Sequence, residues 1–216
     1  MNILLERGLP EEIDGVPIYA DFRNMIRFEQ ILLDDALPEA EKARLGLGQL
    51  FDELPPGGAE RAVERLMWFY RCGRGADEGD AHQTAHAKAP DRAYDFDADA
   101  PLIYAGFYAA YGISLTTVDF LHWWEFVALL EGLPESTAMG QLMRWRTMDL
   151  SQIEDKKTRA RYAALKRQCA VGRTSTARKA SAQEIAQRNR ERVAQRFALA
   201  EQTVHKEDAG KEKETV

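Results

Sequence analysis

The sequence predicts a mainly α-helical protein: a compact helical domain with a small N-terminal β-hairpin and an extended C-terminal arm, partly helical and partly disordered. Three observations indicate this fold class. Apolar residues recur at helical spacing in most segments, an Asp-Gly pair lies between short β-capable runs, and the end of the chain is rich in charge and poor in core residues. We expect the domain to cover residues 1–168 and the arm to cover residues 169–216.

The N-terminal segment carries the hairpin signal and the first helix. Asp14-Gly15 lies between two short β-capable runs, and Asp-Gly is a favoured hairpin turn. Pro17 favours an edge position for the second run, so nothing larger than a hairpin is expected. Asp21 is then predicted to cap a helix that runs through about Leu33.

Two more helices are expected before the centre of the chain. Pro38 opens a helix to about Leu54, although Gly46 and Gly48 inside it cost about 1 kcal/mol each relative to alanine. A third helix is predicted from Ala59 to Cys72. Residues 74–92 show no periodicity and are interpreted as a mobile surface loop.

The stretch from Tyr94 to Leu133 is the densest apolar and aromatic run, and it is predicted to form two packed helices. The first runs from Ala100 to Tyr111, with the Asp99 carboxylate accepting from N–H groups of its first turn. The second runs from Thr116 or Thr117 to about Leu133, and it is apolar almost all round, which favours burial. The alternative is that part of its aromatic surface is kept for a partner.

The C-terminal third becomes increasingly polar. A helix is expected from Ser136 or Thr137 through Met148, and a charged helix from Asp149 or Ser151 to about Cys169. Residues 172–176 are interpreted as a linker, 182–204 as an amphipathic stretch with few core residues, and 205–216 as disordered.

Charge separates the chain into an acidic body and a basic C-terminal region. Residues 1–149 contain 13 Lys and Arg against 26 Asp and Glu, whereas residues 150–216 contain 16 against 9. Cys72 and Cys169 lie far apart without a CxxC pattern, and the first residues do not have the pattern of a secretory signal. A reducing cytoplasm is therefore expected.

Two patterns resemble metal sites, and neither is complete. Asp95-Phe96-Asp97-Ala98-Asp99 resembles the start of a calcium loop, but Ala100 stands where glycine is needed and Gly106 where glutamate is needed. His82 and His86 have the i, i+4 spacing of helical metal ligands but lie in a Gly/Ala-rich segment. We expect an acidic turn and a solvated loop, with no metal ion and no cofactor.

His122 is the strongest candidate for a catalytic group. On the predicted central helix, His122 shares a sector of about 120° with Asp119 and Glu125, and these two acids could orient it as a general base. No nucleophile or glycine-rich oxyanion turn accompanies it, and the sequence contains no GxGxxG, P-loop, HExxH or GxSxG motif. A buried, hydrogen-bonded histidine beside Trp123 and Trp124 is favoured, and the protein is not expected to be an enzyme.

The basic region could form a partner-binding arm. A solvated helix face is the simpler interpretation, and binding to nucleic acid is not favoured because the acidic body would repel it and only Tyr162 supplies an aromatic ring. The cations of the candidate arm are Lys156, Lys157, Arg159, Arg161, Lys166 and Arg167.

Several short segments, taken together and in this order, are similar to those of a known family. They are Asp21-Phe22-Arg23-Asn24 with Phe28-Glu29; Trp68-Phe69-Tyr70-Arg71-Cys72-Gly73; Tyr94-Asp95-Phe96 with Ile103-Tyr104-Ala105-Gly106-Phe107; Tyr111-Gly112-Ile113; and Leu121-His122-Trp123-Trp124-Glu125-Phe126. On these segments the chain resembles the bacteriophage gene-fifteen-product family over about residues 3–168. The residues expected to carry the family motif or the core are Asp21, Arg23, Phe28, Phe69, Cys72, Gly73, Tyr94, Asp95, Ile103, Tyr104, Phe107, His122, Trp123 and Trp124.

The resemblance implies a role in building phage tails. By gene position and size the family looks like the tail assembly chaperones, which hold the tape measure protein soluble while tail tube protein polymerises round it. It implies these two partners, self-association as a further option, no membrane, and location in the host bacterial cytoplasm. The alternative is a structural or nucleic-acid-binding adaptor of the virion that works through the basic arm.

Overall fold

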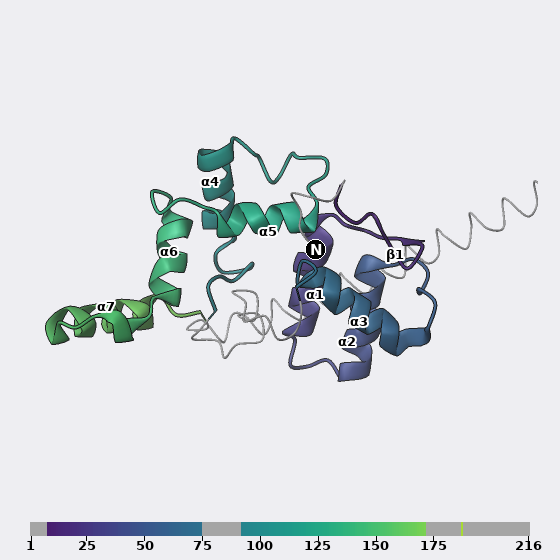
Figure 1. Cartoon of the computed structure of the whole chain (residues 1–216), viewed down its shortest axis with the longest axis horizontal. Coiled ribbons are helices and arrows are strands. Elements are labelled where there is room, and N and C mark those ends of the chain that lie inside the picture. The colour runs from purple at the N-terminus through teal and green to yellow at the C-terminus, as the bar shows by residue number, and fades with distance from the viewer. Residues whose placement is uncertain (1–7, 75–91, 172–186, 188–216) are drawn as a thin grey trace, which may run out of the picture. The chain divides into compact units, whose positions relative to one another are not determined.

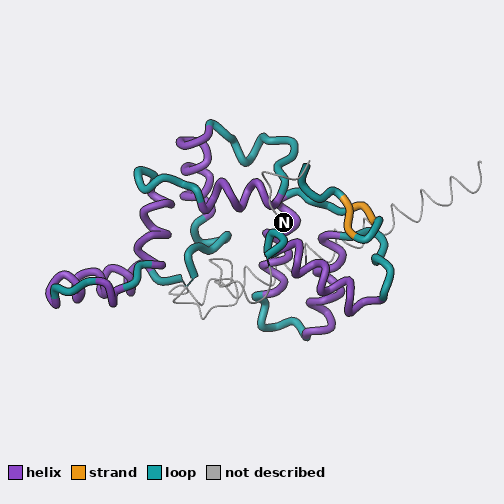
Figure 2. Tube along the Cα trace, viewed as in Figure 1, coloured by secondary structure: helices purple, strands orange, loops and turns teal. Residues whose placement is uncertain are grey.

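The structure, a computed structural model, describes residues 8–74, 92–171 and 187. Within this part the chain is mainly helical, with seven α-helices and a two-stranded hairpin, which confirms the predicted fold class (Figures 1 and 2). Contacts among the described residues separate two units, residues 8–73 in the first and residues 74 and 92–171 in the second. Most of the predicted loop 74–92 and of the arm after residue 169 lies outside the described residues.

The hairpin forms where the Asp-Gly pair predicts it. Strands β1 (Glu12–Ile13) and β2 (Val16–Pro17) pair antiparallel, with Ile13 opposite Val16. The backbone φ angles of Asp14 and Gly15 are +51° and +81°, so both turn residues occupy the left-handed region that a type I′ hairpin requires.

Three helices follow in the same unit: α1 (Phe22–Leu32), α2 (Glu39–Leu50) and α3 (Gly58–Tyr70). Asp21 caps α1 as predicted, since its carboxylate accepts from the Arg23 N–H at 3.0 Å. The predicted end of α2 at Leu54 is wrong. The chain becomes extended at Phe51, and the Leu50 carbonyl accepts from the Tyr19 N–H at 2.8 Å.

Helix α3 ends two residues before the predicted Cys72. The Gly73 N–H donates to the Trp68 carbonyl and the Cys72 N–H donates to the Phe69 carbonyl, each at 3.0 Å, which is the Schellman pattern of helix termination. Cys72 occupies the left-handed position of this motif with a φ of +56°. The glycine expected at the helix stop is therefore one residue beyond the first left-handed residue.

The core of this unit depends on a close approach of α1 and α2. A Cβ atom added at Gly46 would lie 2.7 Å from the ring of Phe28, so glycine is required for this packing. The Phe28 ring meets the Tyr70 ring edge-on, and the Tyr70 hydroxyl donates to the buried Glu29 carboxylate at 2.7 Å. The largest fully buried side chains here are Met25, Ile31, Leu45, Leu50, Leu66 and Phe69.

The second unit contains α4 (Ala100–Tyr111), α5 (Trp123–Glu131), α6 (Ala138–Thr147), the 3-10 helix η3 (Leu150–Gln152) and α7 (Lys156–Cys169). Phe107 of α4 stacks on Phe126 of α5 with ring centroids 5.1 Å apart, and Phe126 stacks on Trp123 at 5.8 Å. The buried aromatic core predicted between Tyr94 and Leu133 is therefore present.

Two helix predictions in this unit are wrong. The central helix begins at Trp123, six or seven residues after the predicted start, because a hydrogen-bonded turn precedes it, in which the Thr117 and Val118 N–H groups donate to the Ser114 carbonyl. The predicted charged helix 149–169 is two helices, η3 capped by Asp149 and α7 capped by Asp155. Thr137 caps α6 as predicted, accepting from the Gly140 N–H at 3.1 Å.

Within the described residues, no helix combines the length and the apolar character that crossing a membrane would require.

Candidate functional site

His122 caps a helix through its side chain. It directly precedes α5, and its Nδ1 accepts a hydrogen bond from the Trp124 N–H at 3.1 Å, while its side chain is buried. Since the helix starts at Trp123, the predicted grouping with Asp119 on one helix face is wrong. The interpretation as a buried, hydrogen-bonded histidine beside the two tryptophans is confirmed.

The acidic segment before α4 forms a turn, as predicted. The Asp95 Oδ1 accepts from the N–H groups of Asp97 and Ala98 at 3.0 and 2.9 Å, and the Arg92 guanidinium lies 3.9 Å from its Oδ2. Arg92, predicted in a mobile surface loop, is buried. Among the described residues, no three or more His, Cys, Asp or Glu side chains are grouped as metal ligands. His82 and His86 lie outside those residues.

The Asp99 side chain does not make the capping hydrogen bond that the sequence predicts. It precedes α4, but its carboxylate caps no N–H of that helix; it accepts from the Asp95 N–H at 2.8 Å and pairs with the Arg146 guanidinium of α6. Both side chains are 6% exposed. An arginine this deeply buried must be paired, because an isolated charge out of water is very costly.

Arg146 holds several segments together. Besides Asp99, its guanidinium donates to the carbonyls of Ala93, at 3.2 Å, and Cys169, at 2.6 Å. It thus joins α6 to the start of α4, to the chain before it and to the end of α7. We call Arg146 with Asp99 the buried ion pair; it is structural, and it sets where α7 leaves the rest of the unit.

Helix α4 presents an uncharged surface. None of its twelve residues is charged, yet only Ile103, Gly106 and Phe107 are buried. With residues set 100° apart, the exposed positions after Ala100 fall within an arc of roughly 140°. We call this surface the α4 face; its members are Pro101, Tyr104, Ala105, Tyr108 and Ala109.

The two tyrosines give the α4 face its aromatic character. The rings of Tyr104 and Tyr108 are stacked, with centroids 6.3 Å apart and an interplanar angle of 14°, and the side chains are 37% and 60% exposed. Phe120, in the segment between α4 and α5, is 56% exposed. Large aromatic rings are usually buried, so this concentration of exposed rings marks a candidate contact surface.

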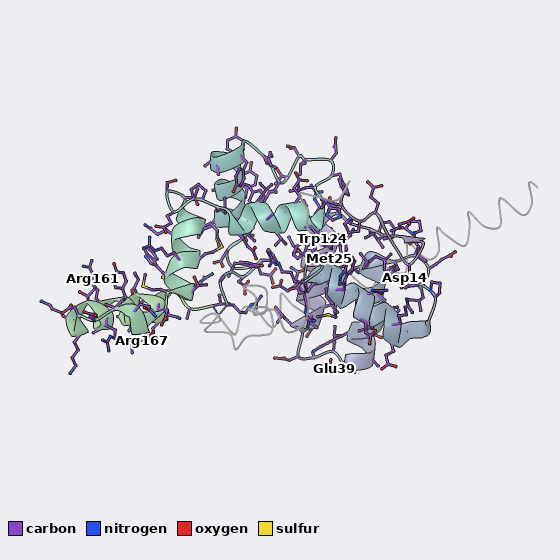
Figure 3. The ribbon with its side chains drawn as sticks, viewed as in Figure 1. Asp14, Met25, Glu39, Trp124, Arg161 and Arg167 are labelled. Atoms are coloured by element: carbon purple, nitrogen blue, oxygen red, sulfur yellow. The ribbon has the colours of Figure 1, made fainter. Side chains whose placement is uncertain are left out.

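Helix α7 presents the opposite chemistry. It contains six Lys and Arg and no acid, packs against α6 and η3, and has no buried residue. Arg161 and Arg167 are labelled on it in Figure 3. Hydrogen bonds from the Thr158 side chain and N–H hold the pKa of the Asp155 carboxyl below its ordinary value, so the capping group stays ionised.

The predicted motif and core residues fall into three groups by exposure. Asp21, Arg23, Cys72 and Gly73 are half-buried, and Tyr104 is exposed. The remaining nine are buried: Phe28, Phe69, Tyr94, Asp95, Ile103, Phe107, His122, Trp123 and Trp124. Sequence analysis missed Tyr108 and Phe120. A signal was available for the first of them: residues 100–111 contain no charge and more apolar residues than one buried stripe can hold, which could have indicated an exposed face.

Comparison with known proteins identifies one matching family. A family model described as Bacteriophage Gp15 protein matches residues 8–171, about three quarters of the chain. The chain belongs to this family. The resemblance noted in the sequence is thereby confirmed. No curated protein and no solved structure matches the chain. The match to the Gp15 family includes both candidate surfaces, the α4 face and α7.

Proposed function

We propose that this member of the Gp15 family is a non-catalytic tail assembly chaperone. It would keep the tape measure protein soluble in the host bacterial cytoplasm and guide tail tube polymerisation around it. The observation that carries the proposal is the α4 face, an uncharged helical surface with exposed stacked tyrosines.

The α4 face suits an apolar helix as its ligand. Tyr104 and Tyr108 form a flat aromatic edge, and Ala105 and Ala109 beside them are small enough for a second helix to approach closely. A tape measure protein, as a long helical chain, would offer apolar stripes of this kind before the tube encloses it. The acidic character of the chain, with a net charge of −6, would keep such a complex soluble.

The exposed area of the α4 face is sufficient for reversible binding. At 37% and 60% exposure, and with 150–250 Å² for a whole aromatic side chain, the two tyrosines offer roughly 200 Å². Covering that area is worth about 5 kcal/mol before the cost of association is subtracted. Several copies along one long partner would each contribute this much, which suits a chaperone that must later be displaced.

Co-expression with the adjacent tape measure protein tests the proposal. The wild-type chain is expected to raise the soluble fraction of that protein and to co-purify with it. The complex should survive about 0.5 M salt, because salt screens surface ion pairs but leaves apolar burial intact. Tyr104→Glu with Tyr108→Glu should abolish both effects, whereas Gln141→Glu, an exposed position on α6, should preserve them.

A second candidate, the nucleic-acid-binding adaptor, has one observation in its favour, the six cations of α7. It predicts that the chain retards duplex DNA at low salt, with affinity falling steeply as salt rises. Tight DNA binding, together with a tape measure protein whose solubility is unchanged by co-expression, would reject the chaperone and favour the adaptor.

A further inference from the structure

Helix α7 has a composition that its own folding does not require. A helix of fourteen residues with no buried side chain contributes little to a core, and this one also contains six cations without an acid. Helices of this kind usually gain support from ion pairs between residues i and i+4. In α7 the corresponding pair, Lys157 and Arg161, has the same sign and is repulsive.

The placement of two of the six cations is also unfavourable for the helix. Lys156 and Lys157 occupy its first turn, where the positive end of the helix dipole disfavours cations. Arg159 and Lys166 are engaged, since they donate to backbone carbonyls before the helix. The side chains of Lys156, Lys157 and Arg161 make no hydrogen bond or ion pair within the described part of the chain. These three cations are therefore available for a contact outside the helix.

A complementary surface lies on α3 of the same chain. Glu60 and Glu64 are exposed, four residues apart, and neither they nor the nearby Glu53 forms an ion pair with any described residue. These two α3 acids repel each other as the α7 cations do. Leu54, four residues before the start of α3, is a large apolar residue that is 53% exposed. Residues 8–73 as a whole carry 13 acids against 7 Lys and Arg.

We propose that α7 of one copy of this protein binds α3 of a second copy. The i, i+4 spacing is identical on both helices, so Lys157 and Arg161 can lie opposite Glu60 and Glu64 and relieve both repulsions. Half-exposed Tyr162 and Leu165 of α7 can meet Leu54. Because two different surfaces meet, the contact is head-to-tail and can extend into a short array.

A second copy fits α7 better than nucleic acid does. The net charge of residues 8–73 is −6, which repels phosphates and attracts α7. Tyr162 is the only aromatic residue of α7, so stacking on bases would be sparse. The inference does not depend on the chaperone role, although an array would let several copies line one extended partner.

Sedimentation velocity of the full chain tests this contact. At about 20 mM salt the weight-average mass should rise above that of the monomer as the concentration is raised into the range of roughly 0.1–1 mM, and the rise should disappear above about 0.3 M salt. Lys157→Glu with Arg161→Glu should abolish association, and so should Glu60→Lys with Glu64→Lys. Lys42→Glu with Arg44→Glu on α2 makes the same change in net charge as the α7 reversal and should leave association intact.

Mixing the two reversed variants identifies the partner surface. Each is expected to be monomeric alone. The mixture should associate, since unchanged α3 of the first variant can bind unchanged α7 of the second, and reversed α7 of the first can bind reversed α3 of the second. Far-UV circular dichroism checks that each variant is folded. A chain that stays monomeric at low salt would overturn the proposal. So would association that survives either reversal, a mixture that stays monomeric, or retardation of duplex DNA by α7 without self-association.

Discussion

Replacing Arg146 by alanine should be among the most damaging single changes in this protein. Its guanidinium pairs with Asp99 and donates to two backbone carbonyls, and both charged side chains are 6% exposed. Removal leaves the Asp99 carboxylate buried with one hydrogen bond from the Asp95 N–H. Breaking one partner of a buried ion pair costs about 3–5 kcal/mol, much of the 5–15 kcal/mol that stabilises a typical domain.

Urea unfolding followed by tryptophan fluorescence measures this cost, since Trp123, Trp124 and Trp145 lie in the same unit. Arg144→Ala is the matched control. Arg144 is on the same helix, but its ion pair with Glu135 is exposed, so the control should cost about 0–1 kcal/mol.

A double-mutant cycle separates the interaction energy of the two charges from the other effects of each substitution. Arg146→Met combined with Asp99→Leu removes both charges, so the double variant should be several kcal/mol more stable than the sum of the two single changes predicts. A loss below about 1 kcal/mol for Arg146→Ala, or additive single changes, would show that the pair is not the structural link described above.

Three further substitutions test other parts of the fold. Phe107→Ala on α4 and Trp124→Ala on α5 should each cost about 3–5 kcal/mol, because both rings are buried; a melting shift of only a degree or two for both would refute this. Hydrogen bonds from Arg65 and Arg61 lower the pKa of Asp14 from 3.8, so its stabilising effect is present above pH 3.8 and is lost as pH falls through the lowered pKa. Asp14→Asn keeps a residue that tolerates the left-handed turn; its deficit in thermal stability should therefore be present at neutral pH and vanish in acid, and a pH-independent deficit would contradict the charge pairing.

Local chemistry predicts the starts of α1 and α6. Residue type and the pattern that follows indicate Asp21 as one cap and Ser136 or Thr137 as the other, and Asp21 and Thr137 accept the expected hydrogen bonds. The Asp14-Gly15 turn is equally predictable from the sequence, because few residue pairs tolerate two left-handed positions.

The start of α5 could not be read in the same way. Thr116, Thr117 and Val118 are β-branched and favour helix only weakly. The Thr117 and Val118 N–H groups donate instead to the Ser114 carbonyl in a turn. The cap at this helix is His122, a residue type that gives little capping signal.

Contacts across long sequence separations were beyond sequence analysis altogether. Asp99 and Arg146 are 47 residues apart, and nothing in the local pattern of either distinguishes a buried ion pair from an ordinary cap and an ordinary helix surface. The exposed arc of α4 was missed for a related reason. Periodicity shows that a helix is apolar, but tertiary contacts decide which of its sides is covered.

The contact between Phe28 and Gly46 constrains how this sequence can vary among its relatives. A side chain at position 46 would collide with a ring that is itself held by Tyr70, so a change there is tolerated only after position 28 has become smaller. A smaller residue at 28 alone leaves a cavity, which is destabilising. Each single step is therefore disfavoured, and the two positions should change together or not at all: relatives that keep phenylalanine at 28 should keep glycine at 46.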